Sequence, residues 1–384
     1  MKTTFYIIII GISLVSCKSY KLYNSQQIAT KKIGNEHFSI EKEKMIISSK
    51  VDGKEGRFIF DTGASGSLIT DTTIVNNFSE KEKSTFGMMK DAQRNQIKKV
   101  DFLVEFENGL VSGSPKLFAY YQIPNNKEFD CLDKNVLETT QGILGLDFFT
   151  WNKEKPTLTL DFTNSRLEIA RNKEQSEILK NGFREIKSKF SILDEVYIYV
   201  LIHNKEYKVK FDTGSNSGII LPYSEIESFT DLKPYEIIGN THFSLSGISS
   251  GKRTNYYSGV DVALNENIYT QSIQLTENLN VYNVGMKFIK SFDWIIDFQN
   301  KKMYYRKNEI EIPVDHPEIS VGALAQKGKL KIILLGGDYR TKYELGQNIS
   351  SINGQKVNLE NLCEMQKLLN ETEDWSTLEI EVEK

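Results

Sequence analysis

Two aspartates recur in the same short context and could do chemistry as a pair. Asp61 and Asp212 each follow a phenylalanine and begin an Asp-Thr-Gly tripeptide. Two carboxyl groups a few ångströms apart cannot both ionise cheaply, so they share one proton at acid to mildly acid pH. The ionised group can then deprotonate a water while the protonated group donates to a carbonyl oxygen. We therefore predict that Asp61 and Asp212 are catalytic, with no cofactor and no metal.

The residues that follow each aspartate would support this pair, and they are Thr62, Gly63, Ala64, Thr213, Gly214 and Ser215. The threonines would fix the two loops. The glycines can adopt backbone angles closed to other residues, allow close approach of a partner and leave N–H groups free to orient the carboxylates. The copies differ at their fourth residue, so we expect the Ser215 hydroxyl to hydrogen-bond the Asp212 carboxylate and favour its ionised form.

The two motifs belong to a longer internal repeat. A given tripeptide is expected on the order of 0.1 times in a chain of this length, so a second copy is unlikely by chance. A shift of 151 positions aligns the flanks without a gap, from Val51 on Ile202 to Ile69 on Ile220. We infer two copies of one structural unit.

Strands must position each aspartate. In each copy a turn, around Gly53 or Asn204, leads into a β-rich run that ends at the aspartate. Downstream, an apolar-apolar-Gly run at 143–145 is answered less perfectly by Asn283-Val-Gly. Each half then closes with a predicted β-hairpin, at 158–169 and 294–305. Each carboxylate is therefore expected at the mouth of a strand.

These residues resemble those of the retropepsin-like (pepsin-type) aspartic peptidases, in the bacterial form that carries two lobes on one chain. The resemblance covers roughly residues 38 to 310. It implies a mainly β, two-lobed acid-protease fold with a pseudo-two-fold axis, interlocked threonines and a water between the aspartates. It also implies a peptide or protein substrate and flaps, for which the candidates are 85–95 and 241–252. Ordinary surface hairpins remain the alternative for both segments.

Composition limits the other classes of function. The chain has 384 residues, 39% of them hydrophobic, enough for two or three domains with a large core. Its 48 basic and 51 acidic residues give a net charge of -3, and the lysines are scattered among glutamates. This pattern predicts a solvated, mixed-charge surface and no nucleic-acid partner. We expect a monomer.

The first residues predict export. Residues 1–16 read as a signal peptide, with a basic start and an apolar run too short to span a bilayer. Leu14-Val-Ser-Cys17 resembles the lipobox of bacterial lipoproteins, so Cys17 is the expected lipidation site. Because position 18 is Lys, we favour an outer-membrane anchor facing the periplasm of a bacterial cell envelope. Residues 17–36 would then form the lipidated N-terminus and its tether.

The remaining boundaries follow from the repeat and from charge. We expect an N-terminal lobe at 37–170, a charged linker at 171–187, a C-terminal lobe at 188–308 and a separate unit at 309–384. The Ile-Ser-Ser-Ile-Asn-Gly turn at 349–354 and a helix at 359–370 resemble a small α+β PDZ domain, which could bind peptide or be purely structural. Since Cys131 and Cys363 fall in separate units, we expect no disulfide between them.

Two other functions use the same features. A pseudopeptidase would bind peptide in the same cleft without cutting it, although both aspartates are retained. An adaptor lipoprotein would act through its PDZ-like unit. A metal or phosphoryl-transfer site is disfavoured, because the loops lack further acidic residues.

Overall fold

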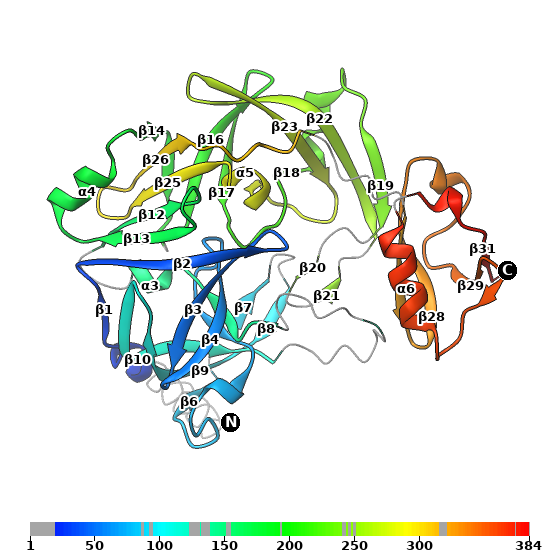
Figure 1. Cartoon of the computed structure of the whole chain (residues 1–384). Coiled ribbons are helices and arrows are strands. Elements are labelled where there is room, and N and C mark those ends of the chain that lie inside the picture. Colours follow the sequence, from blue (N-terminus) through cyan, green and yellow to red (C-terminus); the bar gives the residue numbers. More distant parts are fainter. Residues whose placement is uncertain are drawn as a thin grey trace, which may run out of the picture.

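The protein is mainly β (Figure 1). The computed structural model describes residues 20–383 apart from 86–87, 92–94, 123–130, 132–138, 151–154, 193, 240–242, 245–246, 249–250, 315–320 and 373. Its strands form two large sheets and two small two-stranded ones. We call residues 20–170 the first half, residues 171–314 the second half and residues 321–383 the C-terminal unit.

In its described residues the first half carries thirteen strands. They are β1 (Ile28–Thr30), β2 (Ile33–Glu41), β3 (Lys44–Val51), β4 (Lys54–Phe60), β5 (Leu68–Ile69), β6 (Lys83–Ser84), β7 (Met88–Lys90), β8 (Gln96–Lys98), β9 (Val100–Glu107), β10 (Val111–Tyr120), β11 (Gly142–Leu144), β12 (Thr157–Asp161) and β13 (Arg166–Ala170), with short helices η1 (Thr72–Ile74) and α3 (Asp147–Thr150). The pairing of β3 with β9 closes the ring β3-β4-β11-β5-β10-β9.

The second half repeats this plan. Its elements are α4 (Lys173–Leu179), β14 (Arg184–Ile186), β15 (Ser188–Phe190), β16 (Val196–Ile202), β17 (Lys205–Phe211), β18 (Ile219–Pro222), η2 (Tyr223–Phe229), β19 (Tyr235–Gly239), β20 (Phe243–Ser244), β21 (Gly247–Ile248), β22 (Lys252–Leu264), β23 (Asn267–Thr276), β24 (Asn283–Val284), α5 (Met286–Ile289), β25 (Phe292–Asp297) and β26 (Lys302–Lys307). Pairing of β16 with β22 closes the matching ring β16-β17-β24-β18-β23-β22. The shift of 151 residues carries β4 onto β17.

The two closing hairpins join the halves. Strands β12 and β13 pair with each other, as do β25 and β26, which confirms both predicted hairpins. In addition β12 pairs with β25, with Leu160 opposite Trp294, so the two hairpins form one sheet between the halves. Trp294 is fully buried, and one continuous apolar core extends through both halves. This shared sheet fixes the position of one half against the other.

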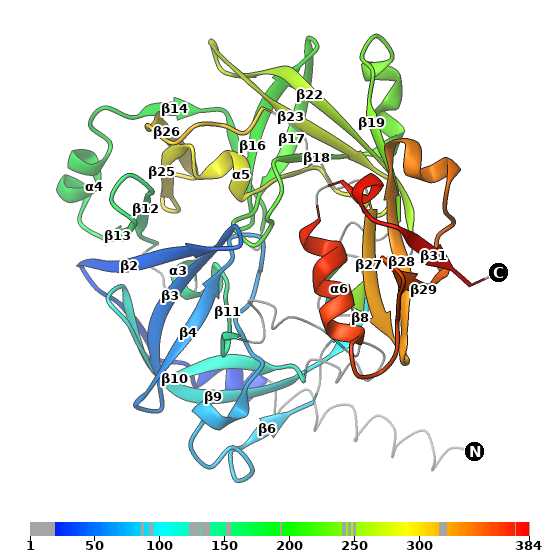
Figure 2. The same cartoon turned by 45° about the vertical axis from the view of Figure 1, so that its right-hand side comes forward.

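The C-terminal unit has its own apolar core. It consists of β27 (Val321–Gln326), β28 (Lys329–Gly336), η3 (Gly337–Thr341), β29 (Asn348–Ile352), β30 (Gln355–Lys356), α6 (Leu362–Glu371), η4 (Trp375–Thr377) and β31 (Ile380–Val382). Strand β28 pairs with β19 of the second half (Figure 2). The predicted helix is confirmed: Leu362, Met365 and Leu369 are buried on its inner face, whereas Leu368 is 38% exposed.

The expected start of this unit at residue 309 is too early. Ile310 and Ile312 pack against the core that the two halves share. The N–H of Gly259 donates to the carbonyl of Val314 (3.3 Å). The segment after β26 therefore belongs to the second half, and the C-terminal unit begins at β27.

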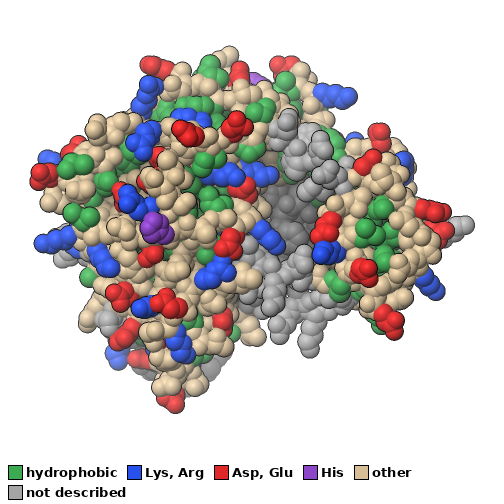
Figure 3. Space-filling model, viewed as in Figure 1, with side chains coloured by type: hydrophobic (Ala, Val, Ile, Leu, Met, Phe, Trp, Pro, Cys, Tyr) green, Lys and Arg blue, Asp and Glu red, His purple; other side chains and the backbone are tan. Residues whose placement is uncertain are grey.

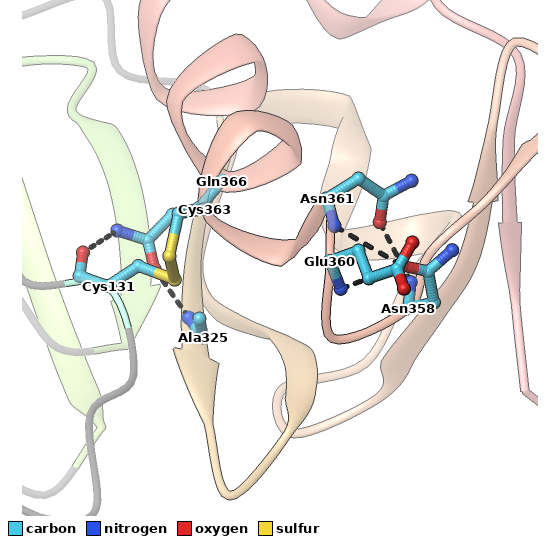
Figure 4. The surroundings of a disulfide bond; sticks show 7 residues. All are labelled: Cys131, Ala325, Asn358, Glu360, Asn361, Cys363 and Gln366. Carbon is cyan, nitrogen blue, oxygen red and sulfur yellow. Dashed lines mark hydrogen bonds between the residues drawn. A yellow bond between two sulfur atoms is a disulfide. The ribbon is translucent and has the colours of Figure 1, made fainter.

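The expectation of no disulfide is wrong. Cys131 of the first half and Cys363 of α6 are bonded, with an S–S distance of 2.08 Å (Figure 4). The Gln366 side chain donates to the Cys131 carbonyl at 2.7 Å. The sequence placed these cysteines in separate units, but pairing of β28 with β19 brings α6 within reach of the first half. The C-terminal unit is thus held by a sheet on one side and by a disulfide on the other.

The segments predicted to be a tether and a linker contain regular elements that pack on the protein. The described part of the 17–36 tether packs on the first half, because Leu22 is buried and β1 pairs with β10. In the 171–187 linker, α4 and β14 form, and β14 pairs with β26. Ile186 is buried there, so tertiary contacts outweigh the absence of a local strand pattern. On the face shown in Figure 3, basic and acidic side chains are interspersed.

Candidate active site

Each predicted catalytic aspartate follows directly after the last residue of a strand, β4 or β17. In the first half β11 lies between β4 and β5, and the Asp61 N–H donates to the carbonyl of Leu144 (2.9 Å). In the second half β24 lies between β17 and β18, and the Asp212 N–H donates to the carbonyl of Val284 (3.0 Å). The apolar-apolar-Gly runs therefore support the two Asp-Thr-Gly loops from beside them.

The two loops are locked together by their threonines. Thr62 Oγ1 donates to the carbonyl of Phe211 (2.8 Å), and Thr213 Oγ1 donates to the carbonyl of Phe60 (2.8 Å). Each hydroxyl also accepts the backbone N–H of the other threonine at 3.0 Å. Both threonines are buried, so these four hydrogen bonds are shielded from water. The structure thus brings together residues 151 positions apart.

The carboxyl group of Asp61 lies against Gly214 and that of Asp212 lies against Gly63, so the two groups are close neighbours. A side chain at Gly63 would overlap the Asp212 carboxylate, and one at Gly214 would overlap the Asp61 carboxylate. Neither glycine has a positive φ. Glycine is therefore required at these positions for the close approach of the loops, and not for a left-handed backbone.

The donors around the two carboxylates differ. At Asp61 the N–H groups of Gly63 (2.7 Å) and Ala64 (3.1 Å) both donate to Oδ1. At Asp212 the Gly214 N–H donates to Oδ1 (2.9 Å) and the side-chain amide of Asn283 donates to Oδ2 (2.9 Å). Both oxygens of Asp212 therefore accept a hydrogen bond, whereas among the described residues the donors to the Asp61 carboxyl group all reach Oδ1.

Asn283 is a site residue that the sequence did not single out. It stands at the position that Ile143 occupies in the first half, and it is buried. The signal was the imperfect second apolar-apolar-Gly run, which begins with an amide. A polar residue in an otherwise apolar strand indicates a buried partner, because a buried amide needs hydrogen bonds. Here that partner is a catalytic candidate.

The expected role of Ser215 is not what the structure shows. Its backbone N–H donates to the Asp212 backbone carbonyl (3.1 Å), and its Oγ lies against Gly285. Among the described residues, its hydroxyl makes no hydrogen bond to the Asp212 carboxylate. The loop turns Ser215 toward the apolar-apolar-Gly run, and Asn283 supplies the side-chain hydrogen bond instead.

Burial raises the pKa of Asp61 to about 7, and the neighbouring Asp212 charge acts in the same direction. The cations Lys44 and Lys210 oppose this shift. Both aspartates nevertheless keep part of their surface accessible. The site therefore places a carboxyl group with a raised pKa next to a second one that accepts hydrogen bonds from two donors.

The candidate flaps are described only in part. In the first, β7 pairs with β8, with Met89 opposite Ile97. In the second, β20 pairs with β21, with Phe243 opposite Ile248. Each is thus antiparallel in its described strands, as predicted for a hairpin.

Other predicted features lie elsewhere or outside the described residues. The signal peptide and Cys17 precede residue 20 and lie outside them. Across the part of the chain that the structure describes, we find no helix long and apolar enough to cross a membrane. Within the same ranges, no group of three or more His, Cys, Asp or Glu side chains is placed to hold a metal ion.

Comparison with known proteins gives no family. No protein-family model matches the chain, and no curated protein matches it. One solved structure that matches is conglutin gamma, described as a unique basic 7S globulin from lupine seeds. It is 9% identical with a TM-score of 0.43, and the match covers 72% of this chain and 95% of that one. Support for a function therefore comes from the geometry of the site.

Proposed function

We propose that the protein is an aspartic endopeptidase, which hydrolyses peptide bonds with a water activated by Asp61 and Asp212. One observation carries this proposal: two copies of one motif meet with their threonines cross-bonded, and each carboxyl group lies against the glycine of the opposite loop. This is the arrangement implied by the resemblance to retropepsin-like aspartic peptidases. On the same ground we propose that the halves are the two lobes of an acid-protease fold.

The hydrogen bonds favour different roles for the two carboxyl groups. Asp212 receives one donor on each oxygen, which stabilises its ionised form, so it is the proposed base. In the part of the chain that the structure describes, the donors to Asp61 reach Oδ1 and none reaches Oδ2, so Asp61 is the proposed acid that carries the shared proton. Asp212 would deprotonate the attacking water, while Asp61 protonates the carbonyl oxygen of the scissile peptide bond.

The pH range follows from the shared proton. A pKa of about 7 for Asp61, raised first by burial and then by Asp212, keeps the acid protonated through mildly acid pH. As pH rises through about 7, Asp61 loses its proton and the pair becomes a dianion without an acid. We therefore expect kcat/KM to fall about tenfold per pH unit above that point.

The C-terminal unit fits a PDZ-like structural role better than an adaptor role. The edge of β27 that would pair with an added peptide strand faces α6. There the N–H of Ala325 donates to the side chain of Gln366 (2.5 Å), and the N–H of Ala323 donates to that of Asn370 (3.2 Å). Gln366 also binds the Cys131 carbonyl (Figure 4). Side chains of α6 already accept hydrogen bonds from these two backbone N–H groups of β27. We therefore propose that the unit stabilises the protein and does not bind a peptide strand.

Location and partners remain proposals from the sequence. A signal peptide and a lipidated Cys17 would anchor the protein in a bacterial envelope, with the outer membrane favoured. The proposed substrate is a peptide or protein, the flaps would cover it, and the protein would act as a monomer without nucleic acid or cofactor.

The test uses the soluble protein from Lys18 onward on a diverse peptide mixture across pH, with and without pepstatin. Pepstatin-sensitive cleavage that disappears in Asp61→Asn is the expected result. Peptide binding without cleavage would favour the pseudopeptidase alternative. If the protein neither binds nor cleaves any peptide at any pH, the proposal is overturned.

A further inference from the structure

Two lysines reach across the site in opposite directions. Lys44, at the start of β3, donates to the carbonyl of Gly214 in the loop of the second half. Lys210, near the end of β17, donates to the carbonyl of Gly63 in the loop of the first half (2.6 Å). Each lysine therefore fastens the Asp-Thr-Gly loop of the opposite half. The motifs themselves do not indicate a lysine at either place.

The two lysines differ in how their charges are neutralised. Lys210 forms an ion pair with Glu195 (2.9 Å), and the Tyr197 hydroxyl also donates to Glu195 (3.1 Å). Lys44 has no ion pair with any described residue. Its acidic neighbour Glu43 is instead paired with Lys290 at 2.6 Å. Lys44 is therefore the one of the two lysines whose positive charge is not cancelled beside the carboxyl pair.

The internal repeat makes this difference clear. The shift of 151 residues that superposes the two motifs places Lys44 on Glu195. The halves thus carry opposite charges at equivalent positions: Lys44 contacts the Gly214 loop, and Glu195 pairs with the lysine that contacts the Gly63 loop. In the second half, Lys210 on the neighbouring strand both cancels Glu195 and supplies the contact to the opposite loop. The net effect is one uncompensated cation next to two carboxyl groups.

We propose that Lys44 is a positioning residue whose ammonium group stabilises the single negative charge shared by Asp61 and Asp212. Its hydrogen bond to Gly214 holds the Asp212 loop, and its charge sets the pH at which the pair gains and loses protons. Lys210 is paired with Glu195; it holds the Gly63 loop in the same way but acts less strongly than Lys44 on the protonation of the pair. The catalytic consequence rests on the proposed peptidase function, but the effect on protonation does not.

The direction of the effect follows from the charged groups that face the pair. These are Lys44 from β3 and Lys210 from β17, with Glu195, Glu43 and Lys290 beyond them. Burial lowers the pKa of Lys44, while Asp212 and Asp61 act to raise it. For Lys210 burial also acts to lower the pKa, but Glu195, Asp212 and Asp61 together outweigh it and the pKa is raised. A nearby cation favours an ionised carboxylate, so removing Lys44 must shift both proton losses of the pair to higher pH.

The experiment measures the protonation of the carboxyl groups directly, by ¹³C NMR titration of the soluble protein labelled at Asp. Lys44→Gln removes the charge and keeps a donor for Gly214, and Lys44→Met removes both. We expect each to raise the titration midpoints of the pair by about one pH unit or more, as for an opposite charge at short range. Lys44→Arg should restore them.

The matched control is the double variant Glu195→Gln with Lys210→Met, which removes a neutral pair and the equivalent contact to Gly63. It should lower stability but shift the midpoints by less than about half of the Lys44→Gln shift, because the net charge is unchanged. Folded Lys44→Gln protein that titrates like the parent would overturn the proposal. So would an equal shift in the double variant.

The same variants separate this inference from the peptidase proposal. If the parent cleaves no peptide but the midpoints move as expected, the peptidase proposal fails and the role of Lys44 stands. If the parent cleaves and the pH profile of kcat/KM is the same in Lys44→Gln, the role of Lys44 fails and the peptidase proposal stands.

Discussion

The two Asp-Thr-Gly loops make the same backbone and threonine hydrogen bonds, but the residues around them differ. Each aspartate N–H donates to the neighbouring apolar strand, at 2.9 Å for Asp61 and 3.0 Å for Asp212, and the threonine contacts are the same in both directions. The side chains next to the loops differ. Asn283 donates a hydrogen bond to Asp212, whereas the equivalent residue in the first half is Ile143. Duplication therefore brings two equal carboxyl groups together, and substitutions around them make the two unequal.

The largest effect should come from breaking the pair itself. Asp61→Asn and Asp212→Asn each leave one carboxyl group without the partner with which it shares a proton. Both should lower kcat/KM by at least about 10³-fold, because acid and base catalysis are lost together. Circular dichroism and thermal unfolding should show a folded protein in each case. Substantial activity in either variant would mean that the two loops do not act as one site.

The next effect tests the part that the loops have in common. Thr62→Val and Thr213→Val each remove two buried hydrogen bonds and leave their backbone partners unsatisfied. Each should cost about 1–3 kcal/mol of unfolding free energy, measured in urea. Thr→Ser at the same positions keeps the hydroxyl and should cost less. The two Val variants should be alike; a large difference between them would contradict the symmetry of the two loops.

A smaller effect tests the asymmetry. Asn283→Leu removes the side-chain donor to Asp212 and therefore weakens the preference for its ionised form. We expect the acid limb of the kcat/KM profile to move to higher pH by about one unit, while activity is still lost as pH rises through about 7. Ile143→Leu is the matched control at the equivalent position and should leave the acid limb in place. An unmoved limb in Asn283→Leu would show that the amide does not set the roles.

The smallest effect concerns the fourth motif residue. Because the Ser215 hydroxyl does not reach the Asp212 carboxylate, Ser215→Ala should leave the pH profile unmoved and change stability by less than about 0.5 kcal/mol. A shift as large as that of Asn283→Leu would restore the hypothesis drawn from the sequence.

Many of the strands and helices around the site could be predicted from the sequence. The repeat placed the strands that end in Phe60 and Phe211 and the closing hairpins, and the pattern at 359–370 placed the helix of the C-terminal unit. Hydrophobic period and turn residues are local signals. The pairing of the closing hairpins could not be read in the same way. Leu160 and Trp294 are far apart in the chain, and nothing local states that one strand will pair with the other.

The site shows the same division. Asp61 and Asp212 were identifiable because the motif is duplicated, whereas Lys44 and Asn283 were not, since a lone lysine or amide carries no motif. Their roles depend on which loop each one touches across the interface of the halves. The disulfide was missed for a related reason, because only the pairing of β19 with β28 brings Cys363 near Cys131.

The sequence by itself determined that two equivalent strand-and-loop units exist and that each presents one carboxylate at the end of a strand. Tertiary structure alone decided that the carboxylates meet, which one receives the amide of Asn283, and where the charge of Lys44 falls. The physical reason is the distance along the chain over which each signal acts. Turns and the alternation of side chains depend on residues that are neighbours in the sequence. The balance of protons between two carboxyl groups depends instead on burial and on charges that only the folded chain brings together.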